Sequence, residues 1–364
     1  MLNPIMFYLC YIALGFISFL SCVLLGVVRQ RRWGVTVFYC LIVAMVLLVG
    51  MRGLQVGTDT WQFASWVSAS NSVTDVIFWV EVVYFGLGVL GYKLGGMQFY
   101  LLLTAAVTIG CLFAGQRRLL LLHRDAVEQF GLGLVLPLAF FLTISASTFI
   151  FLVANQVRQA MAVGFLLLAI SFLIERRMVA VCCCLFLMMF SHVASIMMIP
   201  VILLVRPLKT SQPMFVVSMV MLILGCAQVF RLVVESSGID YVAERIREGI
   251  YTETKLSIYF KTVVLYLFAT LFTFLKLPNR NRVYVYVLNI YLLVVGISGM
   301  AIEFGEGANR IQRFVVLLLP VLTVMAMTAA RNKQQLFYLI SATSILYFFF
   351  VIANGSFRAT LGLY

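Results

Sequence analysis

Long apolar runs recur from one end of the chain to the other, and they restrict its fold more than any other feature. The runs are about 18 to 25 residues long, which is the length that an α-helix needs to cross a bilayer. With 63% apolar and only 11% charged residues, the composition is far from that of a soluble domain. We therefore expect a single transmembrane domain over residues 1–364. The expected spans lie near residues 4–28, 35–51, 97–115, 131–152, 159–174, 214–234, 256–275, 283–302, 314–330 and 335–353.

Two further stretches decide the number of helices, and with them we predict an all-α, polytopic membrane protein of about 11–13 transmembrane or re-entrant helices. Residues 78–95 are glycine-rich and contain Glu81, so a re-entrant or tilted piece is expected there. Residues 178–205 are long for one span and short for two, and the polar pair Ser191-His192 falls near their middle. We interpret them as a broken or hairpin helix, whereas one straight span would invert everything that follows.

The net charge of +13 comes from short basic clusters between the spans. Lys and Arg in short loops mark the cytoplasmic side of a membrane protein, so this placement accounts for the charge without a nucleic-acid partner. It also puts both chain termini outside. The clusters are Arg29, Arg31 and Arg32; Arg117, Arg118 and Arg124; Arg176 and Arg177; Arg206 and Lys209; Lys276, Arg280 and Arg282; Arg331 and Lys333.

No residue pattern indicates a metal site or a nucleotide site. The eight cysteines all lie within apolar runs, where free cysteine behaves as a small hydrophobe. None has metal-ligand spacing with a histidine, and no pair brackets an exposed loop as a disulfide would. The sequence has no glycine-rich phosphate loop and no dinucleotide fingerprint. The histidine of a basic loop, His123, is expected to be exposed to solvent.

The first outer loop, expected over residues 52–78, carries more charge than a simple linker needs. Arg52 and Asp59 are close in the sequence, with Gly53 and Gly57 between them. A cation and a carboxylate held by glycine turns at the membrane surface suit a charged headgroup. The tryptophan-containing part of the loop is too polar to span, so we expect it to lie flat or to fold into the mouth of the protein.

Two other polar segments interrupt apolar sequence on the same side. A helix is expected directly after Asn155, so that Arg158 and Gln159 lie near its N-terminus, which is a favourable place for an anion. The alternative is an interfacial arginine that extends its guanidinium to water. For His192 the two interpretations are a residue that lines a cavity and a histidine that only packs.

The remaining outer loops add further arginines. Residues 235–255 repeat apolar positions at helical spacing, which predicts an amphipathic helix at the interface, either a lid or a cap on the bundle. This segment contains Arg245 and Arg247. A later loop combines two glycines with acids and bases, before a span that contains Pro320. Its polar residues are Glu303, Glu306, Asn309, Arg310 and Arg313.

Several arginines at interface depth suit a phosphate or pyrophosphate attached to a lipid. Guanidinium binds phosphate oxygens in a bidentate way, which gives geometry as well as charge. We expect the clamp on such a group to consist of Arg52, Arg158 and either Arg310 or Arg313.

Three segments resemble the signature of a known family, and they occur in the family's order. They are Arg52 with Val56-Gly57-Thr58-Asp59, then Gln156-Val157-Arg158-Gln159-Ala160-Met161-Ala162, then Ser191-His192-Val193-Ala194-Ser195. Together they resemble the EpsG-like branch of the bacterial O-antigen and exopolysaccharide polymerases, the Wzy group, over roughly residues 35 to 330. The family usually has tyrosine after the Gly-Thr-Asp-Thr motif, whereas this chain has Trp61-Gln62-Phe63.

The resemblance implies a membrane-embedded glycosyltransferase of the GT-C-like kind, in the bacterial inner membrane and active on its periplasmic face. Such an enzyme transfers a growing glycan from undecaprenyl pyrophosphate to a new lipid-linked repeat unit. The implied partners are undecaprenyl-pyrophosphate-linked oligosaccharides and membrane lipids, with a chain-length regulator and a flippase as further candidates. No cofactor and no metal is expected.

The attacking sugar hydroxyl in that reaction needs a general base. We favour His192 as the base or as the group that positions the acceptor, because histidine titrates in the useful range. Asp59 is expected to organise the first loop beside Arg52, and Glu81 is the reserve candidate.

Three alternatives remain open from the sequence. One is an O-antigen ligase of related architecture, which differs only in its acceptor. A transporter or flippase for the same lipid is the second, although we find no internal repeat between the two halves of the chain. The third is a membrane-bound O-acyltransferase, for which His192 alone is thin support.

Overall fold

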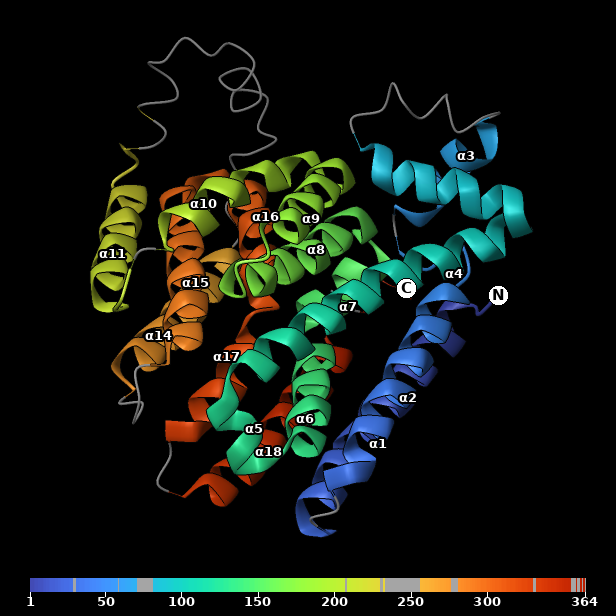
Figure 1. Ribbon diagram of the computed structural model, residues 1–364. Helices are drawn as coiled ribbons and strands as arrows, with labels where there is room; N and C mark the ends of the chain where they lie inside the picture. The colour runs from blue at the N-terminus through green and yellow to red at the C-terminus, as the bar shows by residue number, and fades with distance from the viewer. Residues whose placement is uncertain are drawn as a thin grey trace. The chain divides into compact units, whose positions relative to one another are not determined.

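The computed structural model confirms the all-α prediction: it is built of helices, and the part of the chain that it describes contains no strand. Two compact units are present, one formed by Met1–Ile199 with Thr323–Tyr364 and the other by Pro200–Leu322. Figure 1 shows the helices of both. The structure describes residues 1–28, 31–57, 59–70, 81–206, 208–229, 232, 256–275, 281–329, 332–354, 358, 361 and 363.

The helices of the first unit begin and end close to the polar interruptions in the sequence. They are α1 (Pro4–Val28), α2 (Arg31–Gly50), α3 (Thr60–Ala69), α4 (Val82–Leu122), α5 (Arg124–Phe130), α6 (Leu132–Ser145), α7 (Ser147–Ala154), α8 (Val157–Ile174), α9 (Met178–Ser191), η2 (Val193–Met197), η4 (Met327–Ala329) and α18 (Lys333–Ala353).

The helices of the second unit are α11 (Gln212–Cys226), α14 (Leu256–Phe274), α15 (Arg282–Met300), η3 (Ile302–Phe304) and α16 (Gly305–Val316). Two more, α10 (Met198–Leu204) and α17 (Leu319–Ala326), extend across the boundaries between the units in the sequence.

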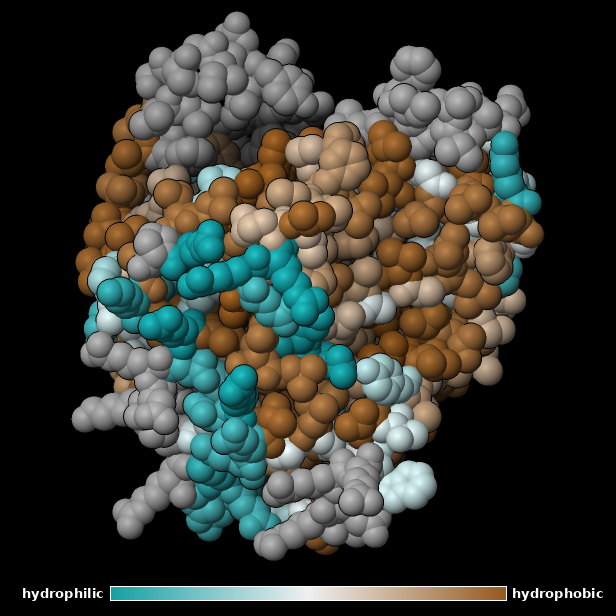
Figure 2. All heavy atoms as spheres, in the orientation of Figure 1, coloured by the Kyte–Doolittle hydropathy of each residue, from teal (hydrophilic) through white to brown (hydrophobic). Residues whose placement is uncertain are grey.

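Membrane-spanning helices account for most of this architecture. Among the described residues, six helices are long and apolar enough to cross a bilayer, or up to eight if each of two bent helix pairs counts as one span. Large apolar side chains also cover the outside; Phe260 is 70% exposed, for example, and Leu346 is 69% exposed. Figure 2 shows hydrophobic residues over most of the visible face and hydrophilic ones gathered in groups. Such an apolar exterior is typical of a surface that faces lipid.

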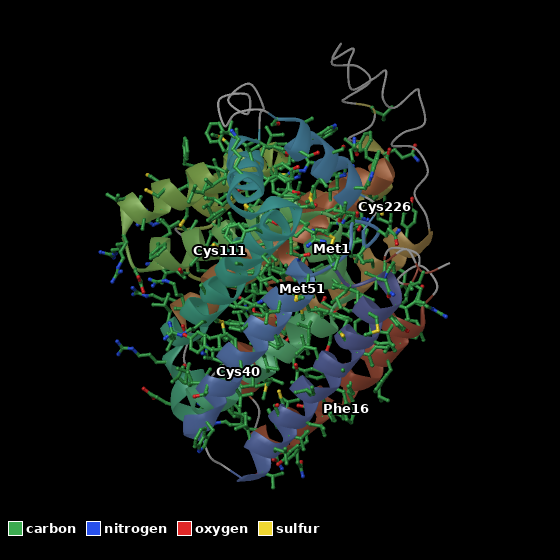
Figure 3. The ribbon with its side chains drawn as sticks, turned by 90° about the vertical axis from the view of Figure 1, so that its right-hand side faces the viewer. Met1, Phe16, Cys40, Met51, Cys111 and Cys226 are labelled. Carbon is green, nitrogen blue, oxygen red and sulfur yellow. The ribbon has the colours of Figure 1, made fainter. Side chains whose placement is uncertain are left out.

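One end of the first unit is defined by the contact between the N-terminus and the segment after α2. Leu2 donates its N–H to the carbonyl of Met51 at 2.7 Å, and the N–H of Gly53 donates back to the carbonyl of Leu2 at 2.7 Å. The Tyr8 hydroxyl donates to the carbonyl of Ile352 at 2.9 Å, so the end of α18 lies at this same end. Figure 3 shows Met1 and Met51 together, with Phe16 and Cys40 farther along α1 and α2.

Two of the predicted basic clusters meet at the C-terminal ends of α4 and α8. Arg118 forms an ion pair with Glu175, and its Nε donates to the Ser171 hydroxyl at 3.1 Å. Arg177 lies 3.2 Å from the same carboxylate. Clusters that the sequence assigns to one side of the membrane therefore lie together in this unit.

The prediction that His123 is exposed to solvent is wrong. Its ring is buried between α4 and α5, and Nδ1 accepts the N–H of Ala126 at 3.3 Å as the N-cap of α5. Burial lowers the pKa of the imidazole, while the charge of Asp125 opposes this shift. The sequence signal was misleading because the loop is only one residue long.

Of the expected piece at 78–95, residues 82–95 form the first limb of a longer helix. From Val82 the helix α4 runs for 41 residues, and it bends at Gly95 and Gly96, where the backbone is not helical. Gly96 has a φ of 70°, a conformation that glycine adopts without strain. In Figure 1 the first limb of α4 lies beside α3, and the rest runs toward α5.

Three other segments differ from the sequence interpretation. The expected span 131–152 is divided between α6 and α7, because Ala146 is extended. Residues 60–69 of the expected first loop form α3, and most of the expected loop around 303–313 forms α16. The amphipathic helix predicted at 235–255 lies outside the described residues.

Candidate functional site

The carboxylate of Glu81 lies at the centre of a polar cluster in the first unit. Arg158 forms an ion pair with one carboxylate oxygen through its Nη1. The other oxygen lies 2.8 Å from Nδ1 of His192 and accepts the N–H of Val193 at 3.4 Å. The Glu81 side chain is only 8% exposed, so these groups replace most of its contact with water. We call Glu81, Arg158 and His192 the Glu81 cluster.

Each member of the Glu81 cluster lies at the end of a helix. Glu81 directly precedes α4, Arg158 is the second residue of α8, and His192 follows α9. Helix ends leave backbone groups without helical partners, and side chains there point beyond the regular structure. Three distant breaks in the apolar pattern are thus brought to one place.

The break at His192 has the form that the sequence predicts for 178–205. His192 adopts an extended backbone with φ of −156° and ψ of 109°, and a 3₁₀ helix, η2, begins at the next residue. The end of α9 frees the N–H of Val193, which then reaches Glu81. The interruption of the helix is therefore what positions both groups on the carboxylate.

Arg158 carries the most accessible charge of the Glu81 cluster, with 29% of its side chain exposed. Its guanidinium carbon lies 4.3 Å from the centre of the Phe63 ring, a cation–π contact that fixes the plane of the group. The N-terminus of α8 places the positive end of a helix dipole next to this cation. A single carboxylate balances only part of that charge, so an anion is favoured here.

Glu81 is held in its ionised form. Burial opposes ionisation, but the hydrogen bond from His192 and the charge of Arg158 outweigh it, so the pKa of the Glu81 carboxyl lies below its ordinary value. An ionised carboxylate only accepts hydrogen bonds, and His192 therefore donates through Nδ1–H. In the neutral ring this leaves Nε2 as an acceptor.

The loop before α3 is fixed against the junction of α7 and α8. Asp59 donates its backbone N–H to Oδ1 of Asn155 at 3.0 Å, and the Thr60 hydroxyl lies 3.1 Å from the carbonyl of Ala154. Gly57 has a φ of 88°, and a Cβ on it would lie 2.3 Å from the Ala154 carbonyl oxygen. The two motifs that are about a hundred residues apart in the sequence therefore pack directly against each other.

Arg52 is buried, with 1% of its surface exposed, and its Nη1 donates to the carbonyl of Val49 at 2.7 Å. Its Nε has no hydrogen-bond partner within the described residues. The hydroxyls of Tyr84 and Tyr100 lie 2.7 Å apart, and both interact electrostatically with Arg52 and with Arg158. This tyrosine pair links the buried arginine to the Glu81 cluster.

The other predicted residues lie elsewhere. Gln159 is buried in α8 beside Arg158. Arg310 and Arg313 belong to α16 of the second unit, where Arg310 is exposed and Arg313 is 4% exposed. Arg245 and Arg247 lie outside the described residues. The structure thus brings Glu81, Arg158 and His192 together, whereas Arg310 and Arg313 belong to the second unit.

The second unit holds its own polar contacts around α16. Lys261 donates to Oδ1 of Asn309 at 2.8 Å, and Nε2 of Gln312 donates to the Thr262 hydroxyl at 2.8 Å. Across the described residues, no group of three or more His, Cys, Asp or Glu side chains is placed to hold a metal ion.

Sequence reasoning did not single out Phe63, Tyr84 and Tyr100 as parts of the site. Tyr84 and Tyr100 lie in apolar runs, where an aromatic residue looks like a packing residue. Phe63 entered the sequence argument only within Trp61-Gln62-Phe63, where the family usually has tyrosine. Asn155, by contrast, gave a usable signal, because amides seldom occur between two strong spans.

Comparison with known families decides the relationship that the motifs suggest. The model of the EpsG family matches residues 35–360, which is most of the chain. The chain belongs to the EpsG family. The EpsG family is one of the Wzy-like polymerase families, so the protein takes part in polysaccharide biosynthesis. No curated protein and no solved structure matches it. All residues of the Glu81 cluster and of the loop before α3 lie within the matched EpsG region.

Proposed function

We propose that this EpsG family member is a membrane glycosyltransferase that polymerises a bacterial polysaccharide, as an O-antigen or related exopolysaccharide polymerase. The substrates are two lipid-linked glycans: the growing chain on undecaprenyl pyrophosphate, and a new repeat unit on the same lipid. The reaction takes place at the periplasmic face of the inner membrane. The observation that supports this proposal best is the Glu81 cluster, which combines a cation, a carboxylate and an imidazole at helix ends.

The bond changes in this reaction are simple to state. A sugar hydroxyl of the new repeat unit attacks the anomeric carbon of the growing chain, and a new glycosidic C–O bond forms. The C–O bond to the lipid pyrophosphate breaks, and the pyrophosphate leaves with the electron pair. Negative charge therefore grows on the leaving group, while the attacking hydroxyl must lose its proton.

Arg158 can stabilise the negative charge that grows on the leaving pyrophosphate. Its accessible guanidinium and the adjacent N-terminus of α8 form a fixed positive region, and a preorganised charge of this kind stabilises a leaving anion more than water does. Arg52 is buried behind it, linked through Tyr84 and Tyr100. We assign Arg52 to holding the positive potential of the site and Arg158 to direct contact with pyrophosphate.

His192 can take the proton of the attacking hydroxyl, and Glu81 sets the orientation of its ring. Because Nδ1 is engaged by Glu81, the neutral ring has Nε2 free to accept the proton of the sugar hydroxyl. Glu81 is a poor base itself, since both of its oxygens already receive hydrogen bonds or an ion pair. We therefore place Glu81 as the positioning residue for His192, in the way that a carboxylate orients the histidine of a catalytic triad.

Asp59 belongs to the loop that Asn155 fixes, and we retain it as the organiser of that loop. In the second unit, Arg310 is exposed and is the better candidate for contact with a lipid diphosphate, whereas Arg313 is buried. Gln159, Arg245 and Arg247 stay candidates for contact with the glycan or the diphosphate.

The test is single-turnover polymerisation with purified protein and lipid-linked repeat units from its own host. We expect His192→Gln to slow the chemical step by about 10²- to 10⁴-fold, the usual contribution of a general base. Glu81→Gln should slow it as well, since it weakens the anchor of the same ring. Binding of the lipid-linked unit should change little in His192→Gln.

The control is His123→Gln, which removes the other histidine, the buried N-cap of α5, and should leave the rate of the chemical step unchanged. Normal turnover in His192→Gln, together with loss of turnover but not of binding in Asp59→Asn, would reverse the assignment and make Asp59 the base. Full polymer length with both His192→Gln and Glu81→Gln would remove the Glu81 cluster from the chemistry altogether.

A further inference from the structure

A cavity of about 370 Å³ lies at one end of the second unit, away from Arg310 and Arg313 within that unit. It is half open and is lined by the start of α11, the start of α15 and the end of α14. The polymerisation chemistry assigned above uses none of its residues. The lining residues are Lys209, Thr210, Ser211, Gln212, Phe272, Thr273, Phe274, Leu275, Asn281, Tyr284, Val285 and Leu288.

The most informative group in the cavity is the Ser211 hydroxyl. Ser211 precedes α11, yet its side chain makes no capping hydrogen bond. The residue is 8% exposed, and its Oγ is buried without a hydrogen-bond partner in the part of the chain that the structure describes. Leaving such a hydroxyl unsatisfied costs about 1–3 kcal/mol, so a polar ligand group in the adjoining cavity that reaches this hydroxyl would relieve that cost.

The surroundings of Ser211 favour an anion. The N-terminus of the 15-residue helix α11 and the N-terminus of the 19-residue helix α15 both line the cavity, through Ser211 and Asn281. Lys209 adds a full positive charge, and the described residues of the lining include no carboxylate. Two helix dipoles and an ammonium group therefore act on the same space.

The segment from Lys209 to Ser211 is held in place by a buried asparagine of α15. Nδ2 of Asn289, which is fully buried, donates to the carbonyl of Thr210 at 3.3 Å. The contact fixes the backbone between Lys209 and Ser211 next to the cavity. A binding group with a preset position loses less entropy when its ligand arrives.

The opposite wall is apolar. It consists mainly of Phe272, Phe274, Leu275, Val285 and Leu288. The Tyr284 hydroxyl is already engaged as a donor to the carbonyl of Phe272 at 2.8 Å, so the tyrosine adds ring surface to this wall. A cavity with one cationic, hydroxyl-bearing wall and one hydrocarbon wall fits an amphiphile better than a free inorganic ion.

We propose that this cavity binds the phosphate headgroup of an anionic glycerophospholipid, with Ser211 and Lys209 as its ligands. The phosphate oxygens accept from the Ser211 hydroxyl and from the Lys209 ammonium group, while the glycerol and the first acyl carbons lie on the aromatic wall. Such a lipid is a bound component of the second unit at the membrane surface, and it takes no part in glycan transfer.

The experiment uses the purified full chain in a non-ionic detergent. Dihexanoyl phosphatidylglycerol is titrated by calorimetry into the wild type, Lys209→Gln and Ser211→Ala. Each substitution should weaken binding by about 10-fold, because each removes a hydrogen bond to a charged group. Lys209→Arg keeps the charge and should bind within about 3-fold of the wild type.

One control variant and two control ligands separate this proposal from simpler explanations. Arg177→Gln removes an exposed cation of the first unit, whose side chain is 65% exposed, and should leave binding unchanged. An equal loss in Arg177→Gln, or wild-type affinity in both cavity variants, would overturn the proposal. Inorganic phosphate that binds as tightly as the lipid would exclude a lipid ligand, and dihexanoyl glycerol that binds as tightly would exclude a phosphate site.

Discussion

Glu81 and His192 are 111 positions apart in the sequence, and their side chains meet at 2.8 Å. The same carboxylate also pairs with Arg158, so one buried acid joins the beginnings of α4 and α8 to the end of α9. An imidazole oriented by a carboxylate and a guanidinium directed to the same place are the two groups that a pyrophosphate-releasing transfer needs. Neither is positioned by its own helix alone, because both depend on Glu81.

The first prediction concerns the shape of the cation at position 158. Arg158→Lys keeps the charge but removes the planar fork and weakens the stacking on Phe63. We expect polymerisation to fall by about 10²- to 10³-fold, the usual effect of losing one electrostatic contact in the transition state. The measurement is polymer length and single-turnover rate with purified protein.

The matched control for this change is Arg177→Lys at the opposite end of α8, which should leave the rate unaltered. Full polymer length with Arg158→Lys would mean that Arg158 is an interfacial anchor and not a pyrophosphate ligand.

The second prediction is a pH dependence of stability. The pKa of Glu81 in the folded protein lies below its ordinary value, because the hydrogen bond from His192 and the charge of Arg158 outweigh burial. Its contribution to stability is therefore complete above the unfolded pKa and is lost as the pH falls through the folded value. Apparent unfolding temperatures of the wild type should drop steeply below about pH 4.5, the range in which unfolded carboxyls take up protons.

In Glu81→Gln this contribution is absent at every pH. The variant should be less stable than the wild type near neutral pH, and the difference between the two should shrink as the solution becomes acidic. Scans must share one heating rate, because membrane proteins commonly unfold irreversibly. A difference that grows on acidification would contradict an ionised Glu81.

The positions of the breaks in the apolar pattern could be predicted from the sequence, but the contacts between residues at different breaks could not. Ser191-His192 in a run of 28 residues predicted the break after α9, and the polar segment at Asn155 predicted the start of α8. Hydropathy gave no means of knowing that Glu81 joins these two breaks. Partner choice depends on how helices pack in three dimensions, and a one-dimensional pattern contains only their spacing.

The sequence predictions were wrong where a short polar segment was compatible with either an exposed loop or a helix or helix cap. The polar residues from Gly305 to Arg313 read as a loop, although they form one face of the amphipathic helix α16. The basic neighbours of His123 suggested a hydrated loop, whereas its ring caps α5. Tyr100 gave no signal at all, because tyrosines in apolar runs usually only pack.

The third prediction tests the close packing of the two motifs. Gly57 has a φ of 88°, and a Cβ there would approach the Ala154 carbonyl oxygen to 2.3 Å. Gly57→Ala should destabilise the protein by about 1–2 kcal/mol from its backbone conformation alone, with the steric contact adding to it. Polymerisation should fall with it, because the loop that carries Asp59 is displaced from Asn155.

Gly110 in α4 is the control for this glycine, since nothing lies within 4 Å of a Cβ built there. In Gly110→Ala, stability should stay the same or rise by about 0.5–1 kcal/mol, as expected when alanine replaces glycine in a helix. Equal stability of Gly57→Ala and Gly110→Ala would show that the loop conformation at Gly57 is not required.

The last prediction concerns the side of the membrane on which the Glu81 cluster lies. Arg177 and its basic neighbours lie at one end of α8, and Arg158 lies at the other. Because basic clusters mark the cytoplasmic side, the Glu81 cluster should face the periplasm.

Trp61, which is 66% exposed in α3, is a suitable reporter for this face. In cells, Trp61→Cys should react with a membrane-impermeant maleimide added outside, and Arg177→Cys should react only after the inner membrane is opened. The wild type, with its eight native cysteines, gives the background. The reverse labelling pattern would place the Glu81 cluster in the cytoplasm, where a polymerase that uses exported lipid-linked units has no substrate.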